Sequence, residues 1–491
     1  MKHQKIIIIG AGIAGLAAAI RLQSRGHEVL VYEANSYPGG KLTETSAQGY
    51  RFDMGPSLFT LPHLVEELFE CANKPVSSYF SYKKKEVICN YFFEDGTTFS
   101  APSDLEEFTK KASETFDVSQ KTMEDYLQAS QKKYESTASI FLEKSLHKLG
   151  TYFSKDMVKA LLSIPHLNIN TSLSKHNENV FEDSRLVQFY NRFATYNGSS
   201  PYQTPGIMSM IPHLEQSLGT YFPKGGMHQI TESLFQLAKD LGVSFVFNTK
   251  VEEIETEGQR VLGIKTHEES VSADIVISNS DVVPSYRKLL KKHKAPEKTL
   301  KQERSSSALI FYWGIKKQFP QLDLHNIFFS KDYKVEFDAI FKQKTISKDP
   351  TVYVNISSKE EASDAPEGCE NWFTMINVPG NTGQNWDDLI EKTRENILQK
   401  LSKLLGENIA ELITYESVLD PRGIEQKTQS HQGSLYGAAS NSKFAAFLRH
   451  PNFSSSISNL YFCGGSVHPG GGIPLCLLSG KIVAEMINKN Q

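Results

Sequence analysis

Short apolar runs that end in glycine or polar residues recur along the chain, and the first stands near the N-terminus. Residues 6–9 are four isoleucines, which predict a strand buried in a parallel sheet. Residues 16–22 are typical of a helix, and a second strand is expected over 28–32. The order strand, helix, strand predicts an α/β fold that begins with a parallel sheet.

Comparable runs return far downstream. Strands are expected over 243–247, 250–254, 273–279 and 459–465, and helices over 230–241 and 475–487. We interpret these segments as returns of the chain to the N-terminal part. Further strands over 305–315, 351–356 and 372–378 predict a second sheet, whereas residues 105–215 are helix-rich by pattern.

The turn after the first predicted strand contains a G-x-G-x-x-G motif. Its glycines permit a tight turn, close approach of a pyrophosphate, and close packing of helix on strand. The N-terminus of the following helix offers free N–H groups to phosphates. Glu33 follows the second strand and can accept hydrogen bonds from a ribose. We therefore expect dinucleotide binding rather than a purely structural turn at Gly10, Ala11, Gly12, Ile13, Ala14, Gly15, Glu33 and Ala34.

Glu33 would repel a 2′-phosphate, which leaves FAD and NAD. Pro38-Gly39-Gly40-Lys41 and Asp53-Met54-Gly55-Pro56-Ser57 then follow. This combination resembles the amine-oxidase and carotenoid-desaturase superfamily, which implies FAD. The resemblance implies that Gly40 and Lys41 lie along the pyrophosphate and flavin, and that Gly55, Pro56 and Ser57 belong to the same site. Most members carry Arg where this chain has Lys41, and a solvated surface charge is the alternative interpretation.

Two later segments complete the expected site. The resemblance implies that Val251 packs near the adenine, although ordinary strand core explains it equally well. Around Gly465, Gly472, Ile473 and Pro474, glycines leave backbone N–H groups open to a planar ring or an anion. A helix starting there would point its positive end at a ring that gains negative charge on reduction.

Across nearly its whole length the chain resembles carotenoid desaturases of the bacterial and fungal type. Gly198-Ser199-Ser200-Pro201, residues 222–227 and residues 305–309 add to the likeness. The implied fold is α/β (α+β): a Rossmann-like FAD-binding domain over 1–75, 221–300 and 456–491, with a discontinuous substrate domain over 76–220 and 301–455. The helical part of the substrate domain, about 105–215, is expected to contact membrane.

The resemblance implies removal of a hydride and a proton from adjacent carbons of a long polyene held in an apolar tunnel. Residues 305–314 and 370–373 most resemble the branch that introduces a 3,4 double bond beside a 1-hydroxy group. Phytoene desaturation, carotenoid isomerisation or polyene saturation, and amine oxidation remain alternatives. A prenyl-binding escort without flavin is a further alternative, which the intact glycine segments disfavour.

Acid–base chemistry is harder to assign. His468 lies in the expected flavin-facing segment and could accept a proton, although a structural role is equally plausible. Phytoene desaturases tend to carry an acid–arginine pair near Asp183, but Val187 stands where the arginine is expected. We therefore interpret Asp183 and Arg185 as a surface pair.

Composition narrows the partners. A net charge of −3 over 491 residues argues against nucleic acid. Five scattered cysteines without a CxxC pair predict neither disulfides nor a metal site.

No apolar run is long enough to span a membrane and no secretory signal is evident, so we expect a cytoplasmic protein at the inner face of the cell membrane. A Lys-rich segment over 118–162 either lies on the membrane or packs on the core. Oxygen or a quinone is the expected electron acceptor.

Overall fold

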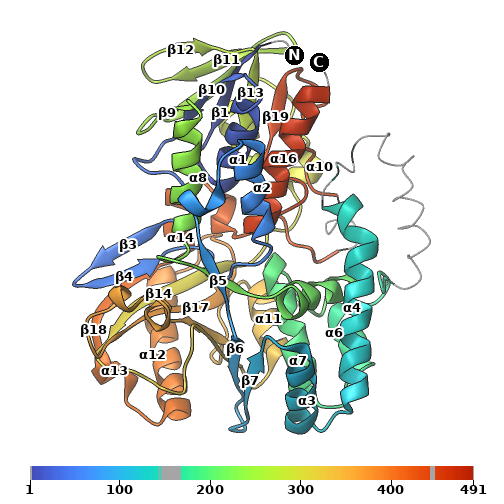
Figure 1. The fold of residues 1–491 in the computed structure, drawn as a ribbon, viewed down its shortest axis with the longest axis vertical. Coiled ribbons are helices and arrows are strands. Elements are labelled where there is room, and N and C mark those ends of the chain that lie inside the picture. Colours follow the sequence, from blue (N-terminus) through green and yellow to red (C-terminus); the bar gives the residue numbers. More distant parts are fainter. Residues whose placement is uncertain (1–2, 143, 145–146, 148–166, 443–447, 490–491) are drawn as a thin grey trace.

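The computed structural model describes residues 3–142, 144, 147, 167–442 and 448–489. Figure 1 shows two parts stacked along the long axis. The upper part holds both ends of the chain and a parallel sheet, and the lower part holds a larger sheet with helices beside it.

The parallel sheet is assembled from three distant segments of the chain. Its strands run in the order β19, β13, β1, β2, β9, and every neighbouring pair is parallel. The side chains of Ile6, Ile7 and Ile8 are fully buried, as the isoleucine run predicts. The strands are β1 (Lys5–Ile9), β2 (Glu28–Tyr32), β9 (Ser244–Val246), β13 (Ile275–Ser278) and β19 (Leu460–Phe462).

Helices α1 (Ile13–Gln23), α8 (Gln229–Asp240) and α16 (Ile473–Lys489) pack together beside this sheet. The strand predicted over 250–254 exists, but it lies outside the parallel sheet. It is β10 (Val251–Glu257), which forms a separate antiparallel sheet with β11 (Arg260–Thr266) and β12 (Ser270–Ser272).

The large sheet has the order β18, β14, β17, β16, β15, β6, β7 and is antiparallel except where β15 meets β6. Alternate residues of β14 face opposite ways, so Phe311 and Trp313 join the core beneath α12 (Trp386–Leu405), whereas Ala308 and Ile310 face the other side. The strands are β6 (Val87–Phe92), β7 (Thr98–Pro102), β14 (Ser307–Ile315), β15 (His325–Phe328), β16 (Val352–Asn355), β17 (Glu370–Val378) and β18 (Ile413–Leu419).

A helical layer lies beside the large sheet (Figure 1). It contains α3 (Leu105–Phe116), α4 (Gln120–Phe141), α6 (Leu173–Glu178) and α7 (Ser184–Asn191). Met123, Tyr126 and Leu127 of α4 are buried in the adjoining core, so this helix packs on the core over its described length, as one of the two interpretations predicted. Much of the remaining 118–162 segment lies outside the described residues.

Short elements connect these parts. They are β3 (Glu44–Ala47), β4 (Tyr50–Asp53), β5 (Tyr82–Lys84), β8 (Tyr221–Pro223), α2 (His63–Cys71), α9 (Val282–Pro284), α10 (Glu297–Leu300), α11 (Tyr333–Asp338), α13 (Ile409–Leu412) and α14 (Pro421–Thr428). Each cysteine has a free thiol. Across the described ranges, no helix is long and apolar enough to span a membrane, and no His, Cys, Asp and Glu cluster could hold a metal ion.

Candidate functional site

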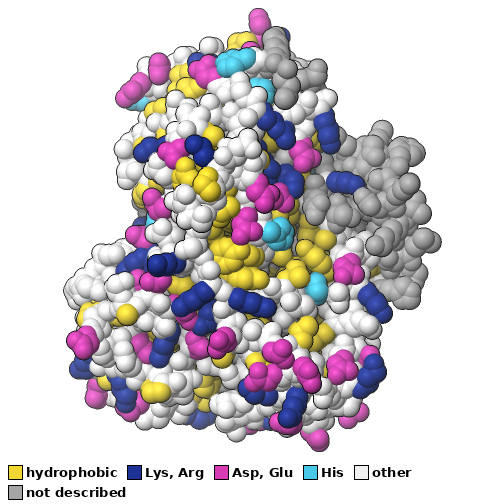
Figure 2. All heavy atoms as spheres, viewed as in Figure 1, with side chains coloured by type: hydrophobic (Ala, Val, Ile, Leu, Met, Phe, Trp, Pro, Cys, Tyr) yellow, Lys and Arg dark blue, Asp and Glu magenta, His cyan; other side chains and the backbone are white. Residues whose placement is uncertain are grey.

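A cavity of about 970 Å³ extends from the ends of the parallel strands to one face of the large sheet. Segments from the beginning, middle and end of the chain line it together. Figure 2 shows hydrophobic side chains gathered on this face of the molecule, between the upper and lower parts. The cavity therefore has a polar half beside the glycine turns and an apolar half beside the sheet.

The N-terminus of α1 forms one wall of the polar half. Gly12, Ile13 and Ala14 line the cavity, and the first helical hydrogen bond joins Leu16 N to Gly12 O at 3.0 Å. The preceding N–H groups have no intrahelical acceptor, so they suit an anion. Gly15 lies behind this wall, because a Cβ there would approach Gly10 O to 2.3 Å, and the helix and strand touch at this point.

Glu33 lies at the end of β2 and is buried. Its Oε2 accepts a 2.8 Å hydrogen bond from Ala11 N, and its Oε1 accepts one of 2.9 Å from Asn35 N. Glu33 and Ala34 line the cavity, whereas Ala11 lies behind it. Oε1 also accepts a 2.9 Å hydrogen bond from Asn35 Nδ2, so both of its lone pairs are used, whereas Oε2 keeps one that could accept a hydrogen bond from a ribose hydroxyl.

Lys41 is half-buried in the cavity wall, where its ammonium group is bound by backbone and does not extend freely into solvent. Its Nζ donates 2.8 Å hydrogen bonds to the carbonyl oxygens of Ser434 and Leu435. Burial lowers the pKa of Lys41 to about 8, although the charge of Asp281 opposes this shift.

A second buried cation, which the sequence analysis missed, lies on the same wall. Arg449 donates a 2.7 Å hydrogen bond to Tyr436 O, and burial lowers the pKa of Arg449 to about 10. Within the described part of the chain, neither Lys41 nor Arg449 forms an ion pair with a carboxylate. This half of the cavity therefore has positive charge that an anionic ligand could balance.

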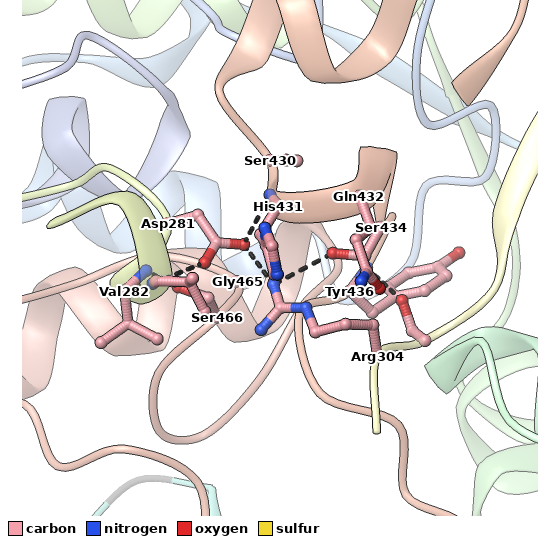
Figure 3. Close-up of polar contacts among 12 residues, drawn as sticks. Asp281, Val282, Arg304, Ser430, His431, Gln432, Ser434, Tyr436, Gly465 and Ser466 are labelled. Carbon is pink, nitrogen blue, oxygen red and sulfur yellow. Dashed lines mark hydrogen bonds and ion pairs between the residues drawn. The ribbon is translucent and has the colours of Figure 1, made fainter. Parts of the chain in front are cut away.

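The loop 430–436, which carries the carbonyl partners of Lys41, is fixed by a buried ion pair (Figure 3). Arg304 pairs with Asp281, which follows β13, and also donates a 3.0 Å hydrogen bond to Ser434 Oγ. Val282 N donates to Ser466 Oγ at 2.9 Å, which ties the same corner to the C-terminal glycine turn. Only the position of Asp281 after a predicted strand could have indicated this role.

The remaining predicted residues also line the cavity: Gly10, Gly40, Gly55, Pro56, Ser57, Val251, Gly465, Gly472, Ile473 and Pro474. Val251 is at once strand core and cavity lining, since it begins β10 and is 5% exposed. The positive end of α16 begins at Ile473, in the wall of the cavity.

His468 lines the cavity, but its surroundings make it a weak base. Its Nε2 lies 2.8 Å from Lys144 O, to which it can only donate. Burial lowers the pKa of His468 to about 4, so the ring is neutral near pH 7. Asp183 and Arg185 form an ion pair outside the cavity, as expected for a surface pair, and Asp183 also accepts a hydrogen bond from Arg185 N at the start of α7.

The apolar half of the cavity is bounded by the large sheet and by helical turns opposite it. The sheet contributes apolar side chains from β18, β14, β17, β15 and β6, and the end of α4 and the helical turns over 206–217 contribute methionine, isoleucine and leucine. These residues are Ile88, Ile310, Ile327, Phe373, Met375, Leu419, Leu142, Met208, Ile211 and Leu214. A long apolar ligand would fit this half.

The polar half fits FAD. A Cβ at Gly472 would meet no atom within 4 Å, and one at Gly40 would meet only Gly12 Cα, at 3.5 Å. Space therefore lies open where the backbone faces the cavity, so a diphosphate or a flat ring can approach it. The unpaired cations and the two helix N-termini match the negative charge of such a cofactor.

Residues 13–488 match the family of flavin containing amine oxidoreductases. The chain belongs to this family. Cyclohexylamine oxidase from Brevibacterium oxydans IH-35A has the same fold, with a TM-score of 0.64 at 16% identity over 100% of this chain and 99% of the other. An oxidoreductase from Methanosarcina mazei gives a TM-score of 0.64 at 17% identity, over 99% of this chain and 100% of the other.

Curated relatives place the chain in the carotenoid desaturase branch of this flavoprotein family. It is 61% identical, over 99% of both chains, to 1-hydroxycarotenoid 3,4-desaturase of Flavobacterium sp. (strain P99-3). It is 33% identical to 4,4′-diapolycopene oxygenase of Methylomonas sp., over 99% of this chain and 98% of the other. The protein is a FAD-dependent oxidoreductase that acts on CH–CH bonds.

Proposed function

We propose that this flavoenzyme introduces the 3,4 double bond of a 1-hydroxycarotenoid, such as a hydroxy-γ-carotene. The observation that carries the proposal is the 61% identity, over 99% of both chains, to a protein of that name. The cavity supports it, because one continuous space joins a dinucleotide cradle to an apolar channel. When bound, FAD accepts a hydride and later passes the electrons to an oxidant.

The chain itself binds and orients the polyene. Alternate side chains of the large sheet, including Ile310, Phe373 and Met375, present an apolar face, and Met208 and Leu214 lie on helical turns that also line the cavity. Burial of apolar surface contributes about 25 cal/mol per Å², which becomes large for a long polyene. Two apolar walls also exclude water from the reacting carbons.

We assign cofactor binding to residues 1–75, 221–300 and 456–491, and substrate binding to 76–220 and 301–455. Lys41 and the start of α16 would stabilise negative charge on the cofactor. Glu33 would accept a hydrogen bond from a ribose hydroxyl. We place the protein in the cytoplasm, at the inner face of the cell membrane where its apolar substrate resides, with oxygen or a quinone as electron acceptor.

The test is incubation of purified holoenzyme in liposomes with phytoene, γ-carotene or a 1-hydroxycarotenoid, each supplied separately with a quinone under anaerobic conditions. We expect conversion of the 1-hydroxycarotenoid alone, with a longer absorbing chromophore and a mass lower by two hydrogens. Conversion of phytoene alone would refute the proposed reaction. An unchanged mass would indicate isomerisation, and added hydrogen would indicate saturation.

A further inference from the structure

Two cavity-lining residues in the described part of the chain have a buried polar side-chain atom without a hydrogen-bond partner. They are Arg192, through Nε, and His325, through Nε2. A buried donor left unpaired is costly, so such an atom in a ligand cavity indicates a partner that the ligand brings.

The positive charge of the Arg192 guanidinium is already balanced by neighbouring protein groups. The guanidinium pairs with Glu215, donates to Tyr91 Oη, and lies 4.3 Å from the ring centroid of Phe193. The second oxygen of Glu215 accepts from Tyr196 Oη. This cluster therefore satisfies its charges internally, by ion pairing and by contact with aromatic faces.

His325 differs because its other ring nitrogen is fixed as an acceptor. The amide nitrogen of Asn355, which can only donate, lies 3.3 Å from His325 Nδ1, and the same amide donates to Leu324 O at 3.1 Å. Tyr353 Oη lies 2.7 Å from Nδ1 and Ser57 Oγ lies 2.8 Å from Tyr353 Oη. The consistent hydrogen-bond pattern is that Ser57 Oγ donates to Tyr353 Oη, and that Tyr353 Oη donates to His325 Nδ1.

That pattern fixes the tautomer. Burial lowers the pKa of His325 to about 3, and the charges of Lys85 and Arg192 act in the same direction, whereas Asp323 opposes them. The ring is neutral, so it carries one proton, and this proton must be on Nε2 because Nδ1 accepts. His325 thus keeps one buried N–H donor without a partner, on a residue that lines the cavity beside Ile327 and Met375.

We propose that His325 Nε2 binds the hydroxyl oxygen of the substrate's end group, and that Ser57 and Tyr353 position it. This inference rests on the proposed function. The hydroxyl of a 1-hydroxycarotenoid is only a few covalent bonds from the carbons that lose hydrogen, so its binding site must adjoin the cofactor half. His325 is linked to that half through Tyr353 and Ser57, and Ser57 follows Gly55 and Pro56 in the cavity wall.

A hydrogen bond from His325 Nε2 would give selectivity for a hydroxylated end group as well as affinity for the substrate. An end group with a hydroxyl satisfies Nε2–H, whereas a hydrocarbon end leaves this donor buried and unpaired. Sites built to hydrogen-bond a substrate hydroxyl discriminate strongly against analogues that lack it, for this reason.

The test compares two substrates in liposomes: a 1-hydroxycarotenoid and the same carotenoid with hydrogen in place of the hydroxyl. In His325→Phe we expect the ratio of kcat/KM values, hydroxylated over deoxy, to fall about tenfold to a hundredfold. His325→Gln keeps an N–H donor and should restore most of the ratio. Flavin content per chain, measured by absorbance, shows that each variant is folded.

Ile327→Val is the matched control, since Ile327 lies two residues further along β15 and lines the same cavity. It should change both kcat/KM values by the same factor. Tyr353→Phe should lower the ratio less than His325→Phe, and the double variant should match His325→Phe alone, because Tyr353 acts through the histidine.

The outcomes separate the two proposals. If the wild type does not prefer the hydroxylated substrate, the proposed function fails. If the wild type prefers it and flavin-loaded His325→Phe keeps that preference, the assignment of His325 is wrong while the proposed function stands. Additive losses in the double variant would refute the positioning role of Tyr353.

Discussion

Lys41 and Ser434 are joined by a 2.8 Å hydrogen bond from Nζ to the backbone carbonyl, although 393 positions separate them. The bond brings a residue of the N-terminal glycine segment against the loop 430–436, whose Ser434 is also bound by Arg304 of the Asp281–Arg304 pair (Figure 3). One wall of the cofactor half therefore depends on three remote stretches of chain.

Lys41 should make the stability of the apoprotein depend on pH. Its pKa is about 8 in the folded protein and its ordinary value is 10.5, so the unfolded state binds more protons between these values. The free energy of unfolding should therefore rise from pH 8 to pH 10.5, by roughly 3 kcal/mol in total. Urea unfolding of wild type and Lys41→Met at several pH values measures the difference. An equal rise in the free energy of unfolding of Lys41→Met would show that Lys41 is not the group that causes the pH dependence.

Two glycines of the same motif should fail in different ways. Gly12 has an ordinary φ of −69°, and a Cβ there meets only Asn279 Nδ2, at 3.1 Å, so Gly12→Ala should fold but block the cofactor. A Cβ at Gly15 would clash with Gly10 O at 2.3 Å, so Gly15→Ala should unfold at lower temperature. Thermal unfolding of the apoproteins and flavin absorbance after gel filtration distinguish the two. Normal flavin content in Gly12→Ala would refute the predicted contact.

Charge reversal at Glu33 should abolish FAD retention, because Glu33→Arg removes the ribose acceptor and the carboxylate that holds Ala11 N. Glu28→Arg is the matched control: it makes the same charge change at the exposed opposite end of β2. The measurement is bound flavin per chain after desalting. Equal flavin in both variants would show that Glu33 has no role in binding.

His468 should not be the group that sets the pH dependence of the reaction. Its pKa is lowered to about 4 by burial, and Nε2 is committed to Lys144 O. His468→Gln should lower kcat/KM modestly through altered packing and leave the shape of the pH profile around pH 6.5 unchanged. Loss of an acidic limb in this variant would instead identify His468 as the proton acceptor.

Much of the cofactor half could be predicted because its signals are local. The isoleucine run, the G-x-G-x-x-G turn and Glu33 lie within a single strand–helix–strand unit, where each residue type has one physical task. In the large sheet, β14, β16 and β17 were predicted from their apolar runs, whereas β6, β7, β15 and β18 were not. The strand that begins at Val251 was predicted, but its place in a separate antiparallel sheet was not, because a short apolar run does not indicate its pairing partner.

By itself the sequence determined the dinucleotide-binding strand–helix–strand unit and most cavity-lining glycines, since backbone conformation and strand burial follow from neighbouring residues, and its resemblance to a flavoprotein family indicated the fold and FAD. Only the tertiary structure decided that Lys41 binds the carbonyls of a remote loop, that Arg449 and the Asp281–Arg304 pair shape the same wall, and that His325 keeps a donor without a partner. Protonation, burial and hydrogen-bond satisfaction depend on atoms contributed by distant segments, and these meet only when the chain folds.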